Sequence, residues 1–210
     1  MRQSIALVNL KPGTAKTTSA VWLAHAFHAA GHSVLLVDAD PAASALEWSD
    51  LADGFPFRIV GLATRELHRR VAEFARPDDV VIIDAPQMED HAGIARSAMR
   101  LADDLVIPVA PTGIELNRMT PVRREIADLD PVRADSARVS VLLNRVVTQA
   151  ASGSDTREVL TEDGWHVLST VIPRKEVFAQ SFGAPVRARG SVYVLVADEL
   201  RHRAELVSQT

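Results

Sequence analysis

Cysteine is absent from this chain of 210 residues, and lysine is scarce. Without cysteine the protein has no disulfides, no thiolate metal sites and no iron–sulfur ligation. No apolar run approaches the roughly 18 residues that a membrane-spanning helix needs. The run that follows Met1-Arg2-Gln3 is too short for a signal peptide. These absences predict a cytoplasmic protein without membrane contact, and the net charge of −4 does not by itself indicate a polyanionic partner.

The few lysines are unevenly placed. Three lysines stand against twenty arginines, and two of the three, Lys11 and Lys16, lie in one short loop. Arginine offers a broad planar fork, whereas lysine is a point charge on a thin stem. A chain that otherwise uses arginine for positive charge has therefore kept lysine where a compact ammonium fits among phosphate oxygens.

Short apolar runs alternate with longer amphipathic stretches along the chain, without internal repeats or low-complexity linkers. Runs that are apolar on both faces and separated by helices indicate a buried parallel sheet. The alternation predicts a three-layer α/β fold with a mostly parallel central sheet, in one domain over residues 1–210. We expect strands at 5–8, 34–37, 58–60, 80–83, 105–109, 139–143 and 167–172. We expect helices at 17–30, 44–51, 65–74, 155–163 and 192–206.

Polar residues follow several of the apolar runs. Asn9, Asp38, Asp84 and Asn144 each stand at the carboxyl end of an expected strand. In an open parallel sheet, ligands bind at that edge. These four residues therefore support the strand assignment without reference to any motif.

The segment Lys11-Pro12-Gly13-Thr14-Ala15-Lys16-Thr17-Thr18 joins the first expected strand to the first expected helix. In such a strand–loop–helix unit, backbone N–H groups and the helix N-terminus converge on phosphate. We expect Lys16 to reach the β- and γ-phosphates and the Thr17 hydroxyl to ligate Mg²⁺. The standard pattern G-x-x-x-x-G-K-[ST] fails, because Leu10 and Ala15 occupy its glycine positions.

The loop instead resembles the deviant Walker A loop of the ParA/MinD family of P-loop ATPases, K-G-G-x-x-K-T-[ST]. Lys11 matches the signature lysine of that family, and Pro12 and Ala15 replace two of its glycines. The resemblance implies ATP and Mg²⁺ as cofactors and slow ATP hydrolysis. The loop residues that it implies as nucleotide contacts are Lys11, Gly13, Thr14, Ala15, Lys16, Thr17 and Thr18.

Two further motifs resemble those of the family. Val34–Asp40, followed by Pro41, resembles its D-x-D-P motif, in which Asp40 would orient the attacking water and Asp38 would support Mg²⁺ or its water shell. Val80–Asp84, followed by Ala85-Pro86, resembles its Walker B strand, which would present Asp84 to Mg²⁺. The bland alternative for each aspartate is a helix cap or a turn.

The resemblance extends to the last third of the chain, to about Pro185. Asn144 stands where the family reads the adenine edge through an amide. The segment around Pro173 and Arg174 resembles the late loop whose backbone cradles the base. A strand-end asparagine without any ligand role is the alternative for Asn144.

The resemblance implies a switch between a monomer and an ATP-sandwiched homodimer, in which Lys11 neutralises phosphates of the neighbouring subunit. It implies DNA segregation by a cytoplasmic, nucleoid-associated protein that binds nonspecific DNA and is stimulated by a ParB-like partner. The short segment before the loop is similar to the small ParA group without an N-terminal DNA-binding domain. We hypothesise that the DNA contacts come from arginines near the end of the chain, namely Arg187, Arg189, Arg201 and Arg203.

Two other functions remain open at this point. A MinD-like membrane-surface switch would need a basic amphipathic C-terminal helix, which residues 192–210 do not supply. A nucleotide-gated scaffold with little turnover is favoured by Pro12 and Ala15. A local alternative is also open, because Met88-Glu89-Asp90 is either a switch segment beside the γ-phosphate or an ordinary helix start.

Overall fold

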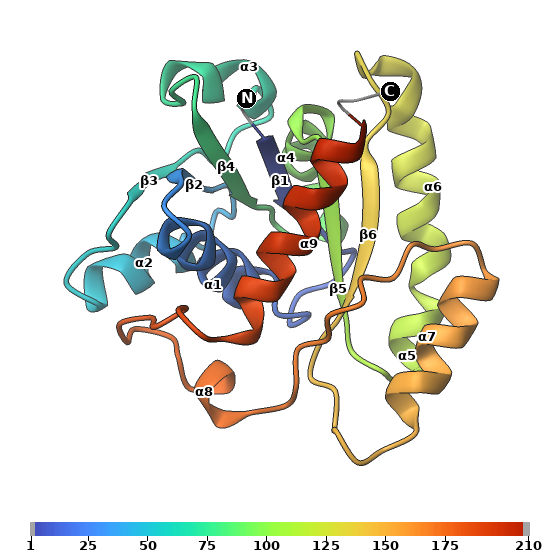
Figure 1. The fold of residues 1–210 in the computed structure, drawn as a ribbon. Helices are drawn as coiled ribbons and strands as arrows, with labels where there is room; N and C mark the ends of the chain where they lie inside the picture. Colours follow the sequence, from blue (N-terminus) through green and yellow to red (C-terminus); the bar gives the residue numbers. More distant parts are fainter. Residues whose placement is uncertain (1–2, 208–210) are drawn as a thin grey trace.

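The computed structural model describes residues 3–207, and in that range six strands form one sheet in the order β3-β2-β4-β1-β5-β6 (Figure 1). Every neighbouring pair is parallel. The strands are β1 (Gln3–Leu7), β2 (Ser33–Asp38), β3 (Arg58–Gly61), β4 (Asp79–Asp84), β5 (Asp104–Val109) and β6 (Arg138–Leu143). The expected three-layer α/β fold is confirmed.

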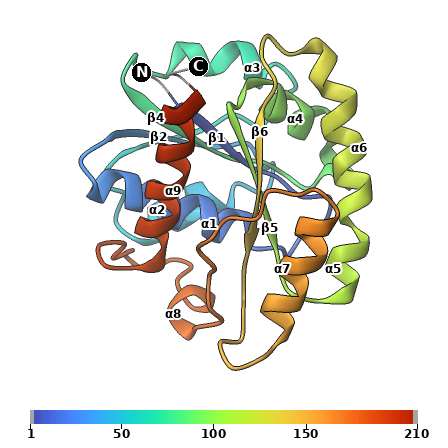
Figure 2. The ribbon, with the colours of Figure 1, turned by 45° about the vertical axis from the view of Figure 1, so that its right-hand side comes forward.

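Helices cover both faces of the sheet (Figure 2). One face packs against α1 (Lys16–Ala29), α2 (Ser44–Leu51) and α9 (Val192–Val207). The other packs against α3 (Leu67–Arg70), α4 (Met88–Leu101), α6 (Met119–Leu129) and α7 (Ser152–Glu162). Two short helices, α5 (Gly113–Asn117) and α8 (Glu176–Ala179), lie beyond the carboxyl ends of the strands, and two 3-10 turns occupy Val71–Glu73 and Asp130–Val132.

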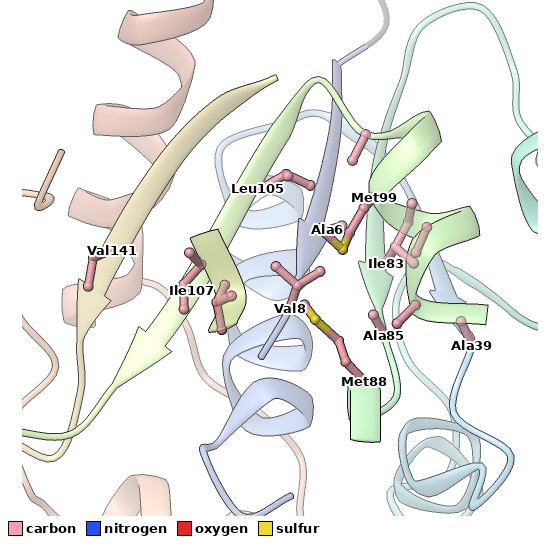
Figure 3. Packing of buried hydrophobic residues seen from close by; sticks show 14 of the residues in the cluster. Ala6, Val8, Ala39, Ile83, Ala85, Met88, Met99, Leu105, Ile107 and Val141 are labelled. Carbon is pink, nitrogen blue, oxygen red and sulfur yellow. The ribbon is translucent and has the colours of Figure 1, made fainter. Parts of the chain in front are cut away.

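The strands are buried on both faces because alternate residues point to opposite layers. In β1 and the residue after it, Ala6 and Val8 join the core under α4, whereas Ile5 and Leu7 join the core under α1. Figure 3 shows the first of these cores, where Met99 of α4 lies over β1 and β4. Two-sided burial explains why these strands read as continuous apolar runs.

The expected strand at 167–172 is wrong. In the described chain, this stretch forms isolated bridges and scattered backbone hydrogen bonds with β6 and with the residues that follow β6, but no continuous strand. The N–H groups of Ser169 and Thr170 donate instead to the Glu199 carboxylate on α9, at 2.6 and 3.1 Å. Because a side chain accepts these hydrogen bonds, no regular ladder forms. No helix within residues 3–207 is both long and apolar enough to cross a membrane.

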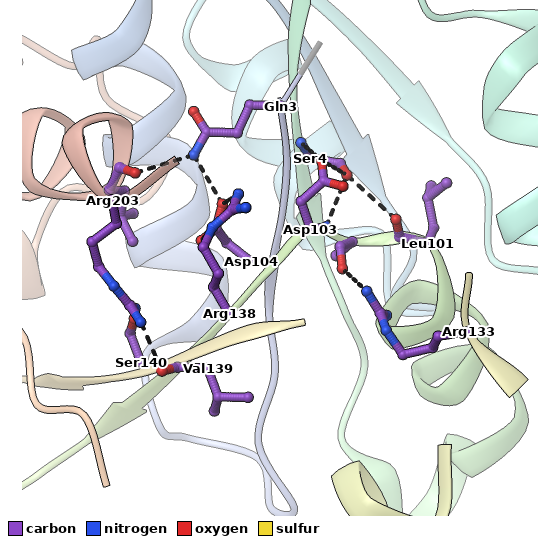
Figure 4. A network of polar contacts seen from close by, with 12 residues as sticks. Gln3, Ser4, Leu101, Asp103, Asp104, Arg133, Arg138, Val139, Ser140 and Arg203 are labelled. Carbon is purple, nitrogen blue, oxygen red and sulfur yellow. Dashed lines mark hydrogen bonds and ion pairs between the residues drawn. The ribbon is translucent and has the colours of Figure 1, made fainter. Parts of the chain in front are cut away.

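A polar network closes the amino end of the sheet (Figure 4). The Asp104 carboxylate accepts two hydrogen bonds from Arg138, at 2.7 and 2.8 Å, and one from Gln3, at 2.9 Å. Gln3 also donates to a backbone carbonyl of α9 at 3.4 Å. The Arg203 guanidinium of α9 donates to the Ser140 hydroxyl on β6. These contacts fasten α9 to β1 and β6, and Asp104 of β5 joins those two strands.

Candidate functional site

A cavity of about 810 Å³ opens at the carboxyl edge of the sheet. Its walls come from the loop before α1, from the loops after β2, β4, β5 and β6, and from α8 and α9. Many of the residues that the sequence singles out line this cavity together: Gly13, Ala15, Lys16, Thr17, Thr18, Asp40, Asn144, Pro173 and Arg174. The fold thus gathers residues from both ends of the chain around one space.

The loop before α1 presents backbone donors to the cavity. Gly13 and Ala15 both have left-handed backbones, with φ of 73° and 67°. This conformation costs a residue with a β-carbon roughly 1–2 kcal/mol, so Ala15 is strained where glycine would not be. The first N–H groups of α1 have no intrahelical acceptor, and its first turn contains no acidic residue. The start of α1 therefore suits an anion.

Lys16 brings a buried positive charge to this loop. Its side chain is only 7% exposed, and its ammonium donates to the Lys11 carbonyl at 3.2 Å. Burial lowers the pKa of Lys16, against the opposing attraction of Asp84, Asp40 and Glu115. An ammonium that is desolvated in this way gains from a bound phosphate.

Asp84, at the end of β4, is buried, and its carboxylate lacks hydrogen bonds from the described residues that would offset the cost of burial. Among residues 3–207, neither of its carboxylate oxygens has a hydrogen-bond partner. Burial raises the pKa of Asp84 to about 7, and the nearby Thr17 hydroxyl and Lys16 ammonium partly offset that rise. Thr17 lies close to Asp84 without meeting hydrogen-bond geometry. An orphaned carboxylate beside a threonine hydroxyl fits a Mg²⁺ ion with its water shell.

The carboxylate of Asp38 is hydrogen-bonded to backbone N–H groups. It accepts the N–H groups of Ala45 at 2.9 Å, of Leu46 at 3.0 Å and of Asp40 at 3.2 Å. Burial raises the pKa of Asp38, and these three donors oppose the shift. Asp38 thus holds the start of α2 and the turn that carries Asp40 to the cavity wall. Of the two candidates at strand ends, Asp84 is the better free ligand.

Asn144 is fixed from two sides. Its side-chain oxygen accepts the Arg145 N–H at 2.7 Å, and its amide donates to the Ser19 hydroxyl of α1 at 3.3 Å. The Ser19 hydroxyl in turn lies 3.1 Å from the Tyr193 hydroxyl of α9. One amide hydrogen and one lone pair of Asn144 remain for a ligand. Pro173 forms an isolated bridge with Val146, in the chain after β6, and it lines the same cavity as Asn144.

The sequence did not indicate several residues of the cavity wall. Arg145 has a left-handed backbone with φ of 56°, and its guanidinium donates to the Gly13 carbonyl across the cavity. Gln87 and Arg145 each stand beside a residue that was singled out, so adjacency was the available signal. Thr112, Phe178 and Tyr193 also line the cavity. Tyr193 gave no signal, because it lies within an apolar helix.

Two predicted contact residues lie outside the cavity wall. Thr14 is buried, and its hydroxyl has no hydrogen-bond partner in the part of the chain that the structure describes. The Lys11 ammonium lies 2.9 Å from the Glu89 carboxylate on α4, and both side chains are 38% exposed. Lys11 is thus turned away from the cavity that Lys16 serves.

The structure does not bring the four candidate DNA-binding arginines together. Arg187 and Arg189 line a second cavity of about 270 Å³ together with Lys175, next to the first cavity. Arg201 is paired with Glu205 at 2.6 Å. Arg203 is turned inward to β6, as described above. Arg187 and Arg189 form no ion pair within residues 3–207, and neither does Arg203, although its guanidinium is hydrogen-bonded to β6.

Comparisons with known proteins agree with this geometry. Residues 5–186 match the family described as the CobQ/CobB/MinD/ParA nucleotide binding domain. The chain is 32% identical over 191 residues to the maintenance of carboxysome distribution protein A of Gloeobacter kilaueensis. That match covers 88% of this chain and 79% of the relative.

Solved structures show the same fold. Apo McdA of Cyanothece superposes with a TM-score of 0.77 at 15% identity, over 95% of this chain and 100% of that one. The septum site-determining protein MinD of Pyrococcus horikoshii, complexed with Mg-ADP, gives a TM-score of 0.76 at 20% identity, over 98% of both chains.

Proposed function

Because this chain belongs to the CobQ/CobB/MinD/ParA family of nucleotide-binding domains, we propose that it is a dimerising ATPase that positions a cargo. The observation that carries this proposal is the desolvated Lys16 ammonium near a buried Asp84 carboxylate that has no hydrogen-bond partner in the described chain, beneath a loop of backbone donors. A bound cation or ligand explains why a fold keeps a buried polar group without a partner. The Mg-ADP in the similar MinD structure supports ATP and Mg²⁺ as that ligand.

Each residue of the site has a separate role in this proposal. Lys16 and the first N–H groups of α1 bind the β- and γ-phosphates. Thr17 and Asp84 hold Mg²⁺, which neutralises charge on the phosphate oxygens when bound. Asp40, at the cavity wall, orients the attacking water and hydrogen-bonds with it as charge redistributes. Asn144, Pro173 and Arg174 surround the base.

Lys11 serves a second nucleotide. Lys16 already occupies the protomer's own cavity, whereas Lys11 does not line it. A second ammonium outside the cavity becomes useful when a neighbouring protomer brings its phosphates to this surface. We therefore propose an ATP-dependent homodimer in which Lys11 contacts the partner's nucleotide.

Two variants test this division of labour. Lys16→Ala removes charge-assisted hydrogen bonds to phosphate and should weaken ATP binding about 100-fold or more. Lys11→Ala should leave ATP binding by the monomer within about twofold, yet prevent the dimer that a nonhydrolysable analogue induces. Fluorescent-nucleotide titration and analytical ultracentrifugation measure the two effects. Equal loss of ATP binding in both variants would refute the proposal.

For the cargo, we propose DNA partition with a ParB-like partner and nucleoid association. Support comes from the unpaired charges of Arg187, Arg189 and Lys175 beside the nucleotide cavity. Contacts with DNA phosphates make affinity fall steeply with salt. Arg187→Glu should weaken ATP-dependent DNA retention, whereas Arg201→Glu, at a residue already paired with Glu205, should change it less. DNA retention that needs no ATP contradicts this assignment.

A second cargo is a protein assembly. The similarity to the carboxysome distribution protein favours it, since that match covers most of both chains. The stimulating partner separates the two cargoes. A small, basic DNA-binding protein that is encoded beside this gene and accelerates ATP hydrolysis favours DNA partition. A partner that accelerates hydrolysis without binding DNA favours a protein cargo.

Two measurements address the remaining functions. Co-sedimentation with liposomes in the presence of ATP would favour a MinD-like membrane switch. An ATP hydrolysis rate that neither DNA nor partner raises would favour a nucleotide-gated scaffold. The strained backbone of Ala15 is the feature that favours slow turnover.

A further inference from the structure

The Lys11–Glu89 ion pair joins the phosphate loop to the first turn of α4. This turn follows Asp84 by only a few residues, and Gln87 between them lines the nucleotide cavity. Glu89 therefore lies on the chain segment that leads directly from the predicted Mg²⁺ ligand to the surface where Lys11 emerges.

The first turn of α4 is hydrogen-bonded to the chain that leads into the phosphate loop. The N–H groups of Met88 and Glu89 donate to the Asn9 and Leu10 carbonyls, at 3.3 and 3.2 Å. His91 has φ of −129° and ψ of 39°, which are not helical values, so α4 is kinked directly after this turn. The kink separates this turn from the rest of α4, although Met88 remains packed in the core.

We propose that Glu89 is a positioning residue that retains Lys11 on its own protomer until ATP is bound. This inference rests on the proposed role of Lys11 across the dimer. An ammonium that is paired with a carboxylate of its own chain is not available to the phosphates of a neighbour, so the pair must open before the dimer closes. Both side chains are 38% exposed, and exposed ion pairs are weak. Glu89 thus raises the protein concentration that dimerisation requires, but it does not prevent dimerisation.

Glu89→Gln tests this role, and the chain offers a matched control. Asp90 lies in the same turn and carries the same charge, but it accepts a hydrogen bond from Gln87 at 3.0 Å and has no ion pair with Lys11. With a nonhydrolysable ATP analogue, Glu89→Gln should lower the protein concentration for half-dimerisation about threefold. Asp90→Asn should leave it unchanged.

The outcomes separate this inference from the proposal beneath it. If Lys11→Ala dimerises like the wild type, the role of Lys11 across the dimer fails. Suppose instead that Lys11→Ala does not dimerise. The Glu89 inference alone then fails if Glu89→Gln half-dimerises at the same protein concentration as Asp90→Asn, or at a higher one than the wild type. ATP affinity of the monomer should stay within about twofold of the wild type in both carboxylate variants.

A second readout does not depend on dimerisation. Because the chain has three lysines, brief treatment with an amine-reactive reagent followed by mass spectrometry can follow each of them. In the nucleotide-free protein, Glu89→Gln should raise labelling of Lys11 relative to exposed Lys175 about twofold or more. Asp90→Asn should not. Unchanged Lys11 labelling in Glu89→Gln overturns the inference.

Discussion

Strand β4 begins and ends with a buried aspartate, and only the carboxylate of the first has hydrogen-bond donors in the described chain. At the amino end, Asp79 accepts the Ser33 hydroxyl at 2.6 Å, the Arg76 N–H at 2.6 Å and the Arg58 guanidinium. At the carboxyl end, Asp84 accepts no hydrogen bond from any residue in the range 3–207. The residue type, the strand and the burial are the same, so the difference lies in the partners.

The contrast extends across the two edges of the sheet. At the amino edge, Asp104 has three donors (Figure 4). At the carboxyl edge, Lys16 is desolvated, and Asp84 and the Thr14 hydroxyl lack partners in the described chain. A buried polar group without a partner costs about 1–3 kcal/mol. The protein therefore accepts a stability cost at one edge, which marks that edge as the place where a ligand binds.

The largest effect that we predict concerns the amino edge. Asp104→Ala leaves the Arg138 guanidinium without its carboxylate and should lower the free energy of unfolding by about 3–5 kcal/mol. Urea denaturation measures this loss. ATP affinity, measured well below the unfolding midpoint, should remain within twofold of the wild type. A large loss of ATP affinity in the folded variant would show that the edges are not functionally distinct.

Asp84→Asn tests the opposite edge. Without this carboxylate, Mg²⁺-dependent ATP hydrolysis should fall about 10- to 100-fold, the usual cost of losing a group that holds a metal through water. The thermal midpoint of the nucleotide-free variant should not fall, because the substitution removes a charge that burial disfavours. A variant that is less stable but hydrolyses ATP normally would show that Asp84 serves the stability of the fold and not the binding of Mg²⁺.

His25 provides a buried titratable group that belongs to neither edge. Burial lowers the pKa of His25 to about 4, while the Val21 carbonyl lies 2.8 Å from Nδ1. Between about pH 6.5 and pH 4 the unfolded chain binds the additional proton, so stability that is present above pH 6.5 is lost as the pH falls. At pH 5 this loss should be about 2 kcal/mol relative to pH 7.

The control for this prediction is His25→Leu, which cannot bind the proton. Urea denaturation of both proteins at pH 7 and pH 5 isolates the histidine contribution. The acid loss should be smaller in the leucine variant by about the amount given above. Equal acid loss in both proteins would assign the sensitivity to the carboxylates at the edges.

The smallest predicted effect concerns strain at the phosphate loop. Ala15→Gly removes the β-carbon from a left-handed residue, but it also gives the unfolded chain more freedom. The two effects partly cancel, so the free energy of unfolding should rise by no more than about 1 kcal/mol. Denaturation with and without ATP distinguishes relief of strain from improved binding. A loss of stability would mean that Ala15 is not strained.

The parts of the molecule that the sequence predicted depend on local pattern. The central strands could be predicted because burial on both faces produces continuous apolar runs. The phosphate loop could be predicted because its residues are contiguous. Helix α6 was not expected, and of α4 only its start at Met88 was considered, as one of two readings of Met88-Glu89-Asp90. In α6 only Met119 and Val122 are fully buried, and in α4 the polar first turn and Gly93 obscure the apolar spacing.

Contacts between distant residues could not be predicted in this way. Nothing in the spacing of the sequence shows that the Asp38 carboxylate is filled by the start of α2, or that Arg145 reaches the Gly13 carbonyl. The segment at 167–172 has the composition of a strand, yet Glu199 takes two of its donors. In each case a side chain hydrogen-bonds to the backbone of a residue that the local pattern does not place beside it.

Helix α9 forms hydrogen bonds at both edges of the sheet. Near its start, Tyr193 joins Ser19 beside the cavity, and toward its other end Arg203 meets β6. Sixteen helical residues form a rod of roughly 24 Å. The helix therefore connects the cavity wall to the amino edge of the sheet. Loosening the contact of Arg203 with β6 would shift Tyr193 in the cavity wall.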